Sequence, residues 1–138
     1  MTGVPCYLVD TNVLVRYLAN DHEKHSPAAR RLMESLKAGK LHLEIPLIAI
    51  VETIHTLRKH YRHEPEIIVT EMLKILNSPW IRLTAPAWIM DALDDFKARR
   101  ASFGDACVAA EARVSGRTIA SFDQGFDGMD GVRRYEPK

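Results

Sequence analysis

The chain has 138 residues, of which 46% are hydrophobic and 27% charged, and this composition suits one globular domain with one main core. Its 19 basic and 18 acidic side chains leave a formal net charge of +1, which excludes a protein that binds nucleic acid over a long basic surface. No apolar run approaches the ~20 residues that a membrane-spanning helix needs, and we expect no signal peptide.

Apolar runs, helical periodicity and turn residues predict alternating strands and helices along the chain. In chain order these are a strand over residues 5–9, helices over 13–19 and 26–38, a strand over 41–45, helices over 46–61 and 66–76, a strand over 80–83, helices over 86–100 and 104–114, and strands over 118–122 and 132–135. Ser26 and Pro27 predict the N-cap and first position of the second helix. Gly39 and Gly116 are expected to end helices.

This alternation predicts a single domain over residues 1–138, with an α/β fold built as a three-layer α/β/α sandwich around a mainly parallel sheet. Active sites of such sheets lie outside the carboxyl ends of the strands. Asp10 and Asp123 each directly follow a predicted strand, so both are expected at that end.

Four acids stand at the edges of apolar segments, and they are Asp10, Glu52, Asp105 and Asp123. If the fold brings these carboxylates together, their like charges need a cation between them. Carboxylate oxygens favour a hard divalent ion such as Mg²⁺ or Mn²⁺. A carboxylate cluster that holds such ions is typical of enzymes that hydrolyse phosphodiesters.

Each acid also has an ordinary structural interpretation. Asp10 suits an N-cap, and Glu52 lies off the apolar stripe of its helix, as a solvated side chain would. Ser102 and Asp105 have the spacing of a capping box, and Asp123 suits an Asx turn after a strand. The interpretation as a shared site therefore depends on all four acids occurring together in this order.

The chain resembles the PIN-domain nucleases, and among them the VapC-type toxins of prokaryotic toxin–antitoxin pairs. Four segments carry the resemblance along essentially the whole chain: residues 8–14 (LVDTNVL), Glu52, residues 104–110 (GDACVAA) and residues 120–126 (ASFDQGF). The resemblance implies a metal-dependent endoribonuclease that uses Mg²⁺ or Mn²⁺, with Asp10, Glu52, Asp105 and Asp123 as its catalytic and metal-binding acids.

Polar neighbours are expected to support these acids. Thr11 or Asn12 would orient the first carboxylate or a metal-bound water, because ligating carboxylates need further hydrogen bonds. The resemblance assigns a similar role to Ser121, where family members often have threonine. Asp127 and Asp130 are interpreted as turn residues. If the alignment with the family is shifted, one of them takes the place of Asp123 as the fourth acid.

Binding of an RNA substrate needs cations outside the acidic pocket, and Arg16, Arg58 and Lys59 are the candidates. For each of them, a solvated or ion-paired surface charge is the ordinary alternative. Apolar residues at Leu47, Ile48 and 67–69 exceed what one small core absorbs, which favours an interface. The resemblance implies a homodimer and an antitoxin partner.

Two other functions remain open at this stage. One is a PIN-domain ribonuclease of RNA processing or decay that has no antitoxin, and the other is a non-catalytic RNA-binding module. A phosphoaspartate phosphatase is disfavoured because Asn12 stands where a D-x-D motif needs its second aspartate. Cys6 and Cys107 lie far apart in apolar contexts without a C-x-x-C pair, so we expect buried free thiols in a reducing cytoplasm.

Overall fold

The computed structural model describes residues 3–138, which form two compact units. Of the described residues, those up to Ala85 form the N-terminal unit and those from Pro86 to Lys138 form the C-terminal unit. Two of the four acids, Asp10 and Glu52, belong to the first unit, and Asp105 and Asp123 belong to the second. Each unit is described by itself below.

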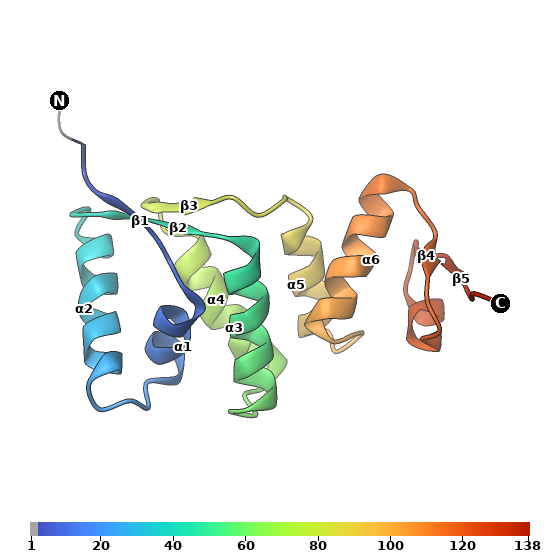
Figure 1. Ribbon diagram of the computed structural model, residues 1–138, viewed down its shortest axis with the longest axis horizontal. Coiled ribbons are helices and arrows are strands. Elements are labelled where there is room, and N and C mark those ends of the chain that lie inside the picture. Colours follow the sequence, from blue (N-terminus) through green and yellow to red (C-terminus); the bar gives the residue numbers. More distant parts are fainter. Residues whose placement is uncertain (1–2) are drawn as a thin grey trace. The chain divides into compact units, whose positions relative to one another are not determined.

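The N-terminal unit contains a three-stranded parallel sheet (Figure 1). Its strands are β1 (Cys6–Leu8), β2 (His42–Ile45) and β3 (Ile81–Leu83), in the spatial order β1-β2-β3. Tyr7 pairs with Leu43, which in turn pairs with Ile81. Because β1 is an edge strand, only one of its sides is hydrogen bonded in this sheet.

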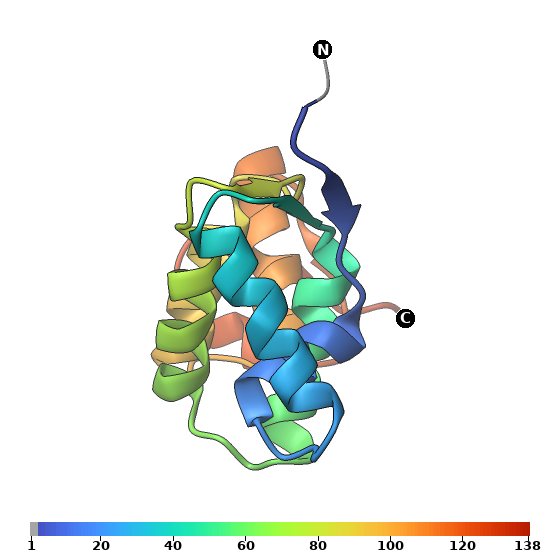
Figure 2. The same cartoon turned by 90° about the vertical axis from the view of Figure 1, so that its left-hand side faces the viewer.

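Four helices connect these strands: α1 (Thr11–Ala19), α2 (His25–Lys37), α3 (Leu47–Lys59) and α4 (Pro65–Leu76). Both views show them on the same side of the three strands (Figures 1 and 2), and α1 packs against α2 and α3. The core that they share with β2 consists of fully buried aliphatic side chains, among them Leu14, Leu43, Ile45, Ile50 and Ile54. This packing brings the start of α1 next to the middle of α3.

The C-terminal unit contains α5 (Ile89–Lys97), α6 (Phe103–Ser115), β4 (Ile119–Ala120), the 3₁₀ helix η1 (Gln124–Gly128) and β5 (Arg134–Tyr135). Helices α5 and α6 pack together, with Phe96 and Phe103 in edge-on contact at 5.8 Å between ring centroids. Strands β4 and β5 are parallel. A small core of Ala109, Ala112, Ile119, Phe126 and Met129 joins α6, β4 and η1.

The α/β class and the parallel pairing of strands agree with the prediction, and the arrangement is consistent with the predicted α/β sandwich. Each of the six predicted helices is present in residues 3–138, with ends displaced by a few residues. Gly116 ends α6 with a left-handed backbone (φ 70°), as predicted. Among the described residues, no helix combines the length and the apolar character that crossing a bilayer requires.

Two local predictions were wrong. Ser26 is not an N-cap, because α2 begins at His25 and Ser26 lies buried in the first turn, where its hydroxyl donates to the Arg16 carbonyl at 2.7 Å. The thiol of Cys6 was expected to be buried, but it lies on β1, whose three residues are exposed at the edge of the sheet. Cys6 is consequently an exposed thiol, while Cys107 is half-buried, and both are free.

Candidate functional site

Asp10 follows β1 and stands at the N-cap position of α1, where the extended backbone (φ −87°, ψ 154°) turns into the helix. Its main-chain carbonyl accepts a hydrogen bond from the Val13 amide at 3.1 Å. Its carboxylate makes no capping hydrogen bond, although aspartate at this position commonly does. The carboxylate is exposed and remains available for another partner.

Glu52 lies on α3, and the Thr11 hydroxyl donates a hydrogen bond to its Oε1 at 2.9 Å. The two residues are 41 positions apart in sequence, and the packing of α1 on α3 brings them together. Because Thr11 directly follows Asp10, this bond connects the first two acidic segments. Glu52 is exposed, as the ordinary interpretation requires, but one of its oxygens is oriented by a residue from another helix.

Asp105 lies in the first turn of α6, where its amide donates to the Ser102 hydroxyl at 3.2 Å. The part of the predicted capping box in which the serine hydroxyl accepts from the main chain is therefore present. This bond uses the main chain of Asp105 and leaves its half-exposed carboxylate out of the cap. A negative group at this position is also stabilised by the helix dipole.

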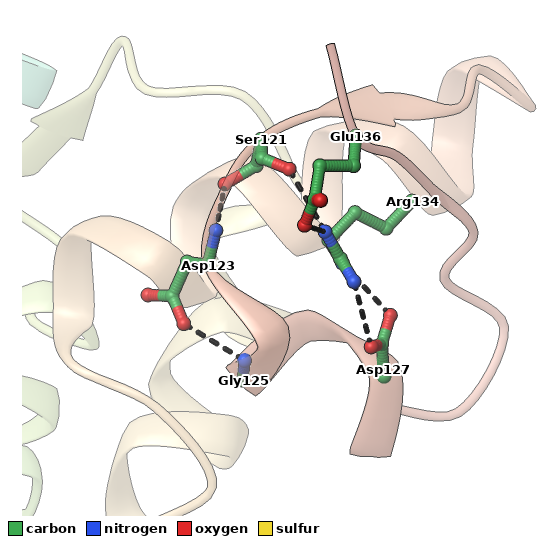
Figure 3. A network of polar contacts seen from close by, with 6 residues as sticks. All are labelled: Ser121, Asp123, Gly125, Asp127, Arg134 and Glu136. Carbon is green, nitrogen blue, oxygen red and sulfur yellow. Dashed lines mark hydrogen bonds and ion pairs between the residues drawn. The ribbon is translucent and has the colours of Figure 1, made fainter. Parts of the chain in front are cut away.

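Asp123 follows β4 and makes the Asx turn that the sequence indicates: its Oδ1 accepts from the Gly125 amide at 2.8 Å. The Ser121 hydroxyl accepts from the Asp123 amide at 2.9 Å. Figure 3 shows the second carboxylate oxygen of Asp123 pointing away from the turn. Asp127 is a poor substitute for Asp123, because both of its oxygens are bound by the Arg134 guanidinium.

The cations proposed for RNA binding differ in their surroundings. Arg16 lies 3.6 Å from Asp21 in an ion pair, and Arg58 donates to the His63 carbonyl at 3.3 Å. Lys59 is exposed at the end of α3. The ordinary interpretation as paired surface charge thus describes Arg16 well, whereas Lys59 has the exposure that contact with a phosphate needs.

The structure brings only some of the candidate residues into contact. Asp10, Thr11 and Glu52 lie together in the N-terminal unit, and Asp105, Ser121 and Asp123 belong to the C-terminal unit. Each unit contains two of the four candidate acids. Across residues 3–138, no three or more His, Cys, Asp or Glu side chains are close enough to hold a metal ion.

The chemistry of these side chains fits a hard divalent cation. The four acids offer carboxylate oxygens, which are the ligands that Mg²⁺ and Mn²⁺ prefer over softer metals. The free carboxylate of Asp10 and the outward oxygen of Asp123 are not used by the fold. Thr11 and Gly125 fix the carboxylates of Glu52 and Asp123, which is how ligating carboxylates are usually oriented.

Two residues of this region were missed by the interpretation of the sequence. Gly125 supplies the amide that Asp123 accepts, and the Asp-x-Gly spacing of an Asx turn would have identified it. Arg134 binds Asp127 and the Ser121 carbonyl. No sequence signal distinguishes Arg134 from the neighbouring Arg133, because the contact depends on the pairing of β5 with β4.

Two comparisons with known proteins show what this chain is similar to. The sequence profile of the family described as "PIN domain" matches residues 7–132, which is most of the chain. The chain is also 27% identical over 132 residues to a protein of Aquifex aeolicus (strain VF5) described as "VapC ribonuclease". That alignment covers 94% of this chain and 97% of the relative, so the two proteins are similar over nearly their whole lengths.

Proposed function

The chain belongs to the PIN-domain family, and on that premise we propose that it is a metal-dependent endoribonuclease that hydrolyses RNA phosphodiester bonds. Its relative over nearly the whole length is described as a ribonuclease. Asp10, Glu52, Asp105 and Asp123 are proposed as the acids that bind Mg²⁺ or Mn²⁺. The proposed setting is the cytoplasm, as the toxin of a type II toxin–antitoxin pair.

The observation that carries this proposal is the hydrogen bond from Thr11 to Glu52. An exposed glutamate on a helix ordinarily needs no such partner, and an exposed hydrogen bond contributes little to stability. The bond instead orients a carboxylate next to Asp10, whose own carboxylate is free of the helix cap. Within residues 3–138 neither acid forms an ion pair, and a divalent cation would offset the charge of both carboxylates.

The residues have separate roles in the proposed reaction. Asp10, Glu52, Asp105 and Asp123 would bind the divalent metal through carboxylate oxygens, while Thr11 and Ser121 keep two of the acidic segments in place. When bound, a divalent ion lowers the pKa of a water molecule and offsets the charge that develops on the phosphate.

The remaining polar groups are assigned to orientation and substrate binding. Asn12 lies exposed in the first turn of α1, and its amide is proposed to orient a water or a phosphate oxygen. Lys59 is the first candidate for contact with the RNA backbone, because it is exposed. Arg58 and Arg16 are secondary candidates, since each already has a partner in the N-terminal unit. Phosphate contacts of this kind position the RNA without selecting its sequence.

The direct test is cleavage of a pool of structured RNAs by the purified protein. Wild type is compared with and without Mg²⁺ or Mn²⁺, in EDTA, and as the Asp10→Asn and Glu52→Gln variants. Matched controls are Asp94→Asn and Glu34→Gln, which change exposed acids on α5 and α2. We expect cleavage only with the metal, a loss of more than about 100-fold in each site variant, and wild-type rates in both controls.

Other outcomes of this experiment would overturn parts of the proposal. Cleavage that persists in EDTA would exclude the metal-dependent mechanism. A folded wild-type protein that binds RNA but no Mn²⁺, and that cuts no RNA in the pool, would favour the non-catalytic module. Loss of activity in Asp94→Asn to the same extent as in Asp10→Asn would show that the assay reports general damage.

The toxin role and the homodimer need tests of their own. A small upstream reading frame that encodes a protein with a basic DNA-binding N-terminus, and that restores growth when expressed together with this chain, supports the toxin role. Growth unaffected by the chain alone would favour RNA processing or decay. Ile48 and Ile67 are large exposed apolar side chains of the N-terminal unit, so light scattering is expected to give the mass of a dimer.

A further inference from the structure

Arg134 lies on β5, and all three nitrogens of its guanidinium are engaged (Figure 3). Its Nε and Nη2 donate to the two oxygens of Asp127 at 2.9 and 3.0 Å. Its Nη1 donates to the Ser121 carbonyl at 3.0 Å and to Glu136 Oε1 at 2.9 Å. The Arg134 side chain is only 12% exposed, whereas that of Asp127 is 54% exposed, so the arginine is the fixed member of the pair.

These contacts bridge the two ends of the turn that carries Asp123. Ser121 precedes Asp123 at the end of β4, and Asp127 follows it in η1. The guanidinium binds a main-chain carbonyl at the first end and a carboxylate at the second. The residues from 121 to 127 are thereby fixed at both ends by one planar group, and the planar fork of an arginine is suited to this geometry.

Inside this turn, the carboxylate of Asp123 has one fixed oxygen and one free oxygen. Oδ1 accepts from the Gly125 amide, while the other oxygen points away from the turn (Figure 3). A side chain at Gly125 would crowd this carboxylate, because an added Cβ would lie 3.0 Å from Asp123 Oδ1 and the carboxylate would have to shift. The direction of the free oxygen therefore depends on the position of the Gly125 amide, which lies between the two ends that Arg134 holds.

We propose that Arg134 is a positioning residue for Asp123, and that it fixes the turn so that the free carboxylate oxygen keeps the direction needed to bind a divalent cation. This inference rests on the proposed function, in which Asp123 is a metal ligand. Arg134 touches neither the substrate nor the ion, and it acts through Ser121, Asp127 and the Gly125 amide. Residues that orient metal ligands typically change metal affinity or activity by about 10–100-fold when they are replaced.

A purely structural role for Arg134 is the alternative, since β4 and β5 are each two residues long and the guanidinium helps to join them. The two roles differ in what a substitution changes. A structural role predicts a lower melting temperature with unchanged metal affinity in the folded protein. A positioning role predicts weaker Mn²⁺ binding and a looser Gly125 amide in a protein that is still folded.

The experiment compares Arg134→Gln, Arg134→Lys and Asp127→Asn with wild type. The matched control is Arg133→Gln, since Arg133 is the neighbouring arginine and also donates to a main-chain carbonyl, that of Gly116 at 3.0 Å. Free Mn²⁺ is measured by electron paramagnetic resonance, and exchange of the Gly125 amide is measured by NMR in metal-free protein. Should Arg134→Gln fail to fold, Asp127→Asn removes only one end of the bridge.

We expect Arg134→Gln to weaken Mn²⁺ binding by about 10–100-fold and to speed exchange of the Gly125 amide. Arg134→Lys should show a smaller defect of both kinds, because lysine keeps the charge but lacks the planar fork. Arg133→Gln should resemble wild type. Unchanged Mn²⁺ affinity and unchanged Gly125 exchange in folded Arg134→Gln and Asp127→Asn would overturn the proposal.

The readouts separate this inference from the proposed function. A wild-type protein that binds no Mn²⁺ contradicts the proposed function. In that case Asp123 is not a metal ligand, and Arg134 has no metal ligand to position. A wild type that binds Mn²⁺, with Asp123→Asn defective and Arg134→Gln normal, leaves the proposed function intact and overturns only the role of Arg134.

Discussion

The hydroxyl of Thr11 donates a hydrogen bond to Glu52 Oε1 at 2.9 Å and so connects the start of α1 to the middle of α3. Two acids that are far apart in sequence become neighbours through this contact, because Asp10 directly precedes Thr11. The bond is exposed, so its main effect is on the direction of a carboxylate and not on the free energy of unfolding. Much of the functional interpretation depends on this pair.

Replacement of Thr11 by valine removes the hydroxyl and leaves a side chain of similar shape. We expect Thr11→Val to raise the Mn²⁺ concentration for half-maximal RNA cleavage by about 10–100-fold, with little change in the melting temperature. Thr11→Ser should retain wild-type behaviour because it keeps the hydroxyl. The control is Thr70→Val, which removes an exposed hydroxyl that donates to a carbonyl within α4. Equal Mn²⁺ dependence of Thr11→Val and wild type would contradict the assigned role.

Thr53, next to Glu52, is fully buried, and its hydroxyl has no hydrogen-bond partner among residues 3–138. An unsatisfied buried hydroxyl costs about 1–3 kcal/mol, and valine fills nearly the same volume without it. We therefore expect Thr53→Val to raise the free energy of unfolding by about 1 kcal/mol, as measured by urea denaturation. Destabilisation by a similar amount would show that the hydroxyl has a partner after all.

Gly125 and Gly128 both lie in η1 and form a matched pair. A Cβ at Gly125 would lie 3.0 Å from Asp123 Oδ1, whereas a Cβ at Gly128 would meet nothing within 4 Å. We expect Gly125→Ala to displace the Asp123 carboxylate and reduce RNA cleavage by at least about 10-fold, while Gly128→Ala stays within about 2-fold of wild type. Equal activities of the two variants would exclude a role for the Asx turn in placing Asp123.

The hydrogen bonds from Arg134 hold the pKa of Asp127 below its ordinary value of 3.8. The stabilisation from this contact is therefore present at pH values above the ordinary pKa, and it is lost only as the pH falls through the lower, folded-state pKa. We expect NMR titration of the Asp127 carboxyl carbon to give a midpoint below 3.8, and Arg134→Gln to move it upward. A midpoint in wild type at or above the ordinary value would contradict the ion pair.

Local features of the fold were predictable from the sequence where a few neighbouring residues determine them. The cap of α6 by Ser102, its end at Gly116 and the Asx turn at Asp123 were all predicted and confirmed. Each depends on side chains and main-chain groups within a few positions of one another. The alternation of strands and helices likewise predicted the parallel pairing.

Features that depend on distant parts of the chain were not predictable. The exposure of β1 follows from its place at the edge of the sheet, which a short apolar run does not indicate. Ser26 lies inside α2 because its hydroxyl bonds to the Arg16 carbonyl, ten residues earlier. The role of Arg134 was missed for the same reason, because its contact with Ser121 depends on the pairing of β5 with β4. The candidate acids were found from their order along the chain, and the groups that orient them needed the structure.

The most direct test of the central claim, that Asp10 and Glu52 hold the same ion, is Mn²⁺ binding measured by electron paramagnetic resonance. Wild type is compared with Asp10→Asn, Glu52→Gln and the double variant. We expect each single substitution to weaken the same binding event by more than about 10-fold and the double variant to be little worse, because the two carboxylates share one ion. Wild-type affinity in either single variant, or two sites lost independently, would contradict the account.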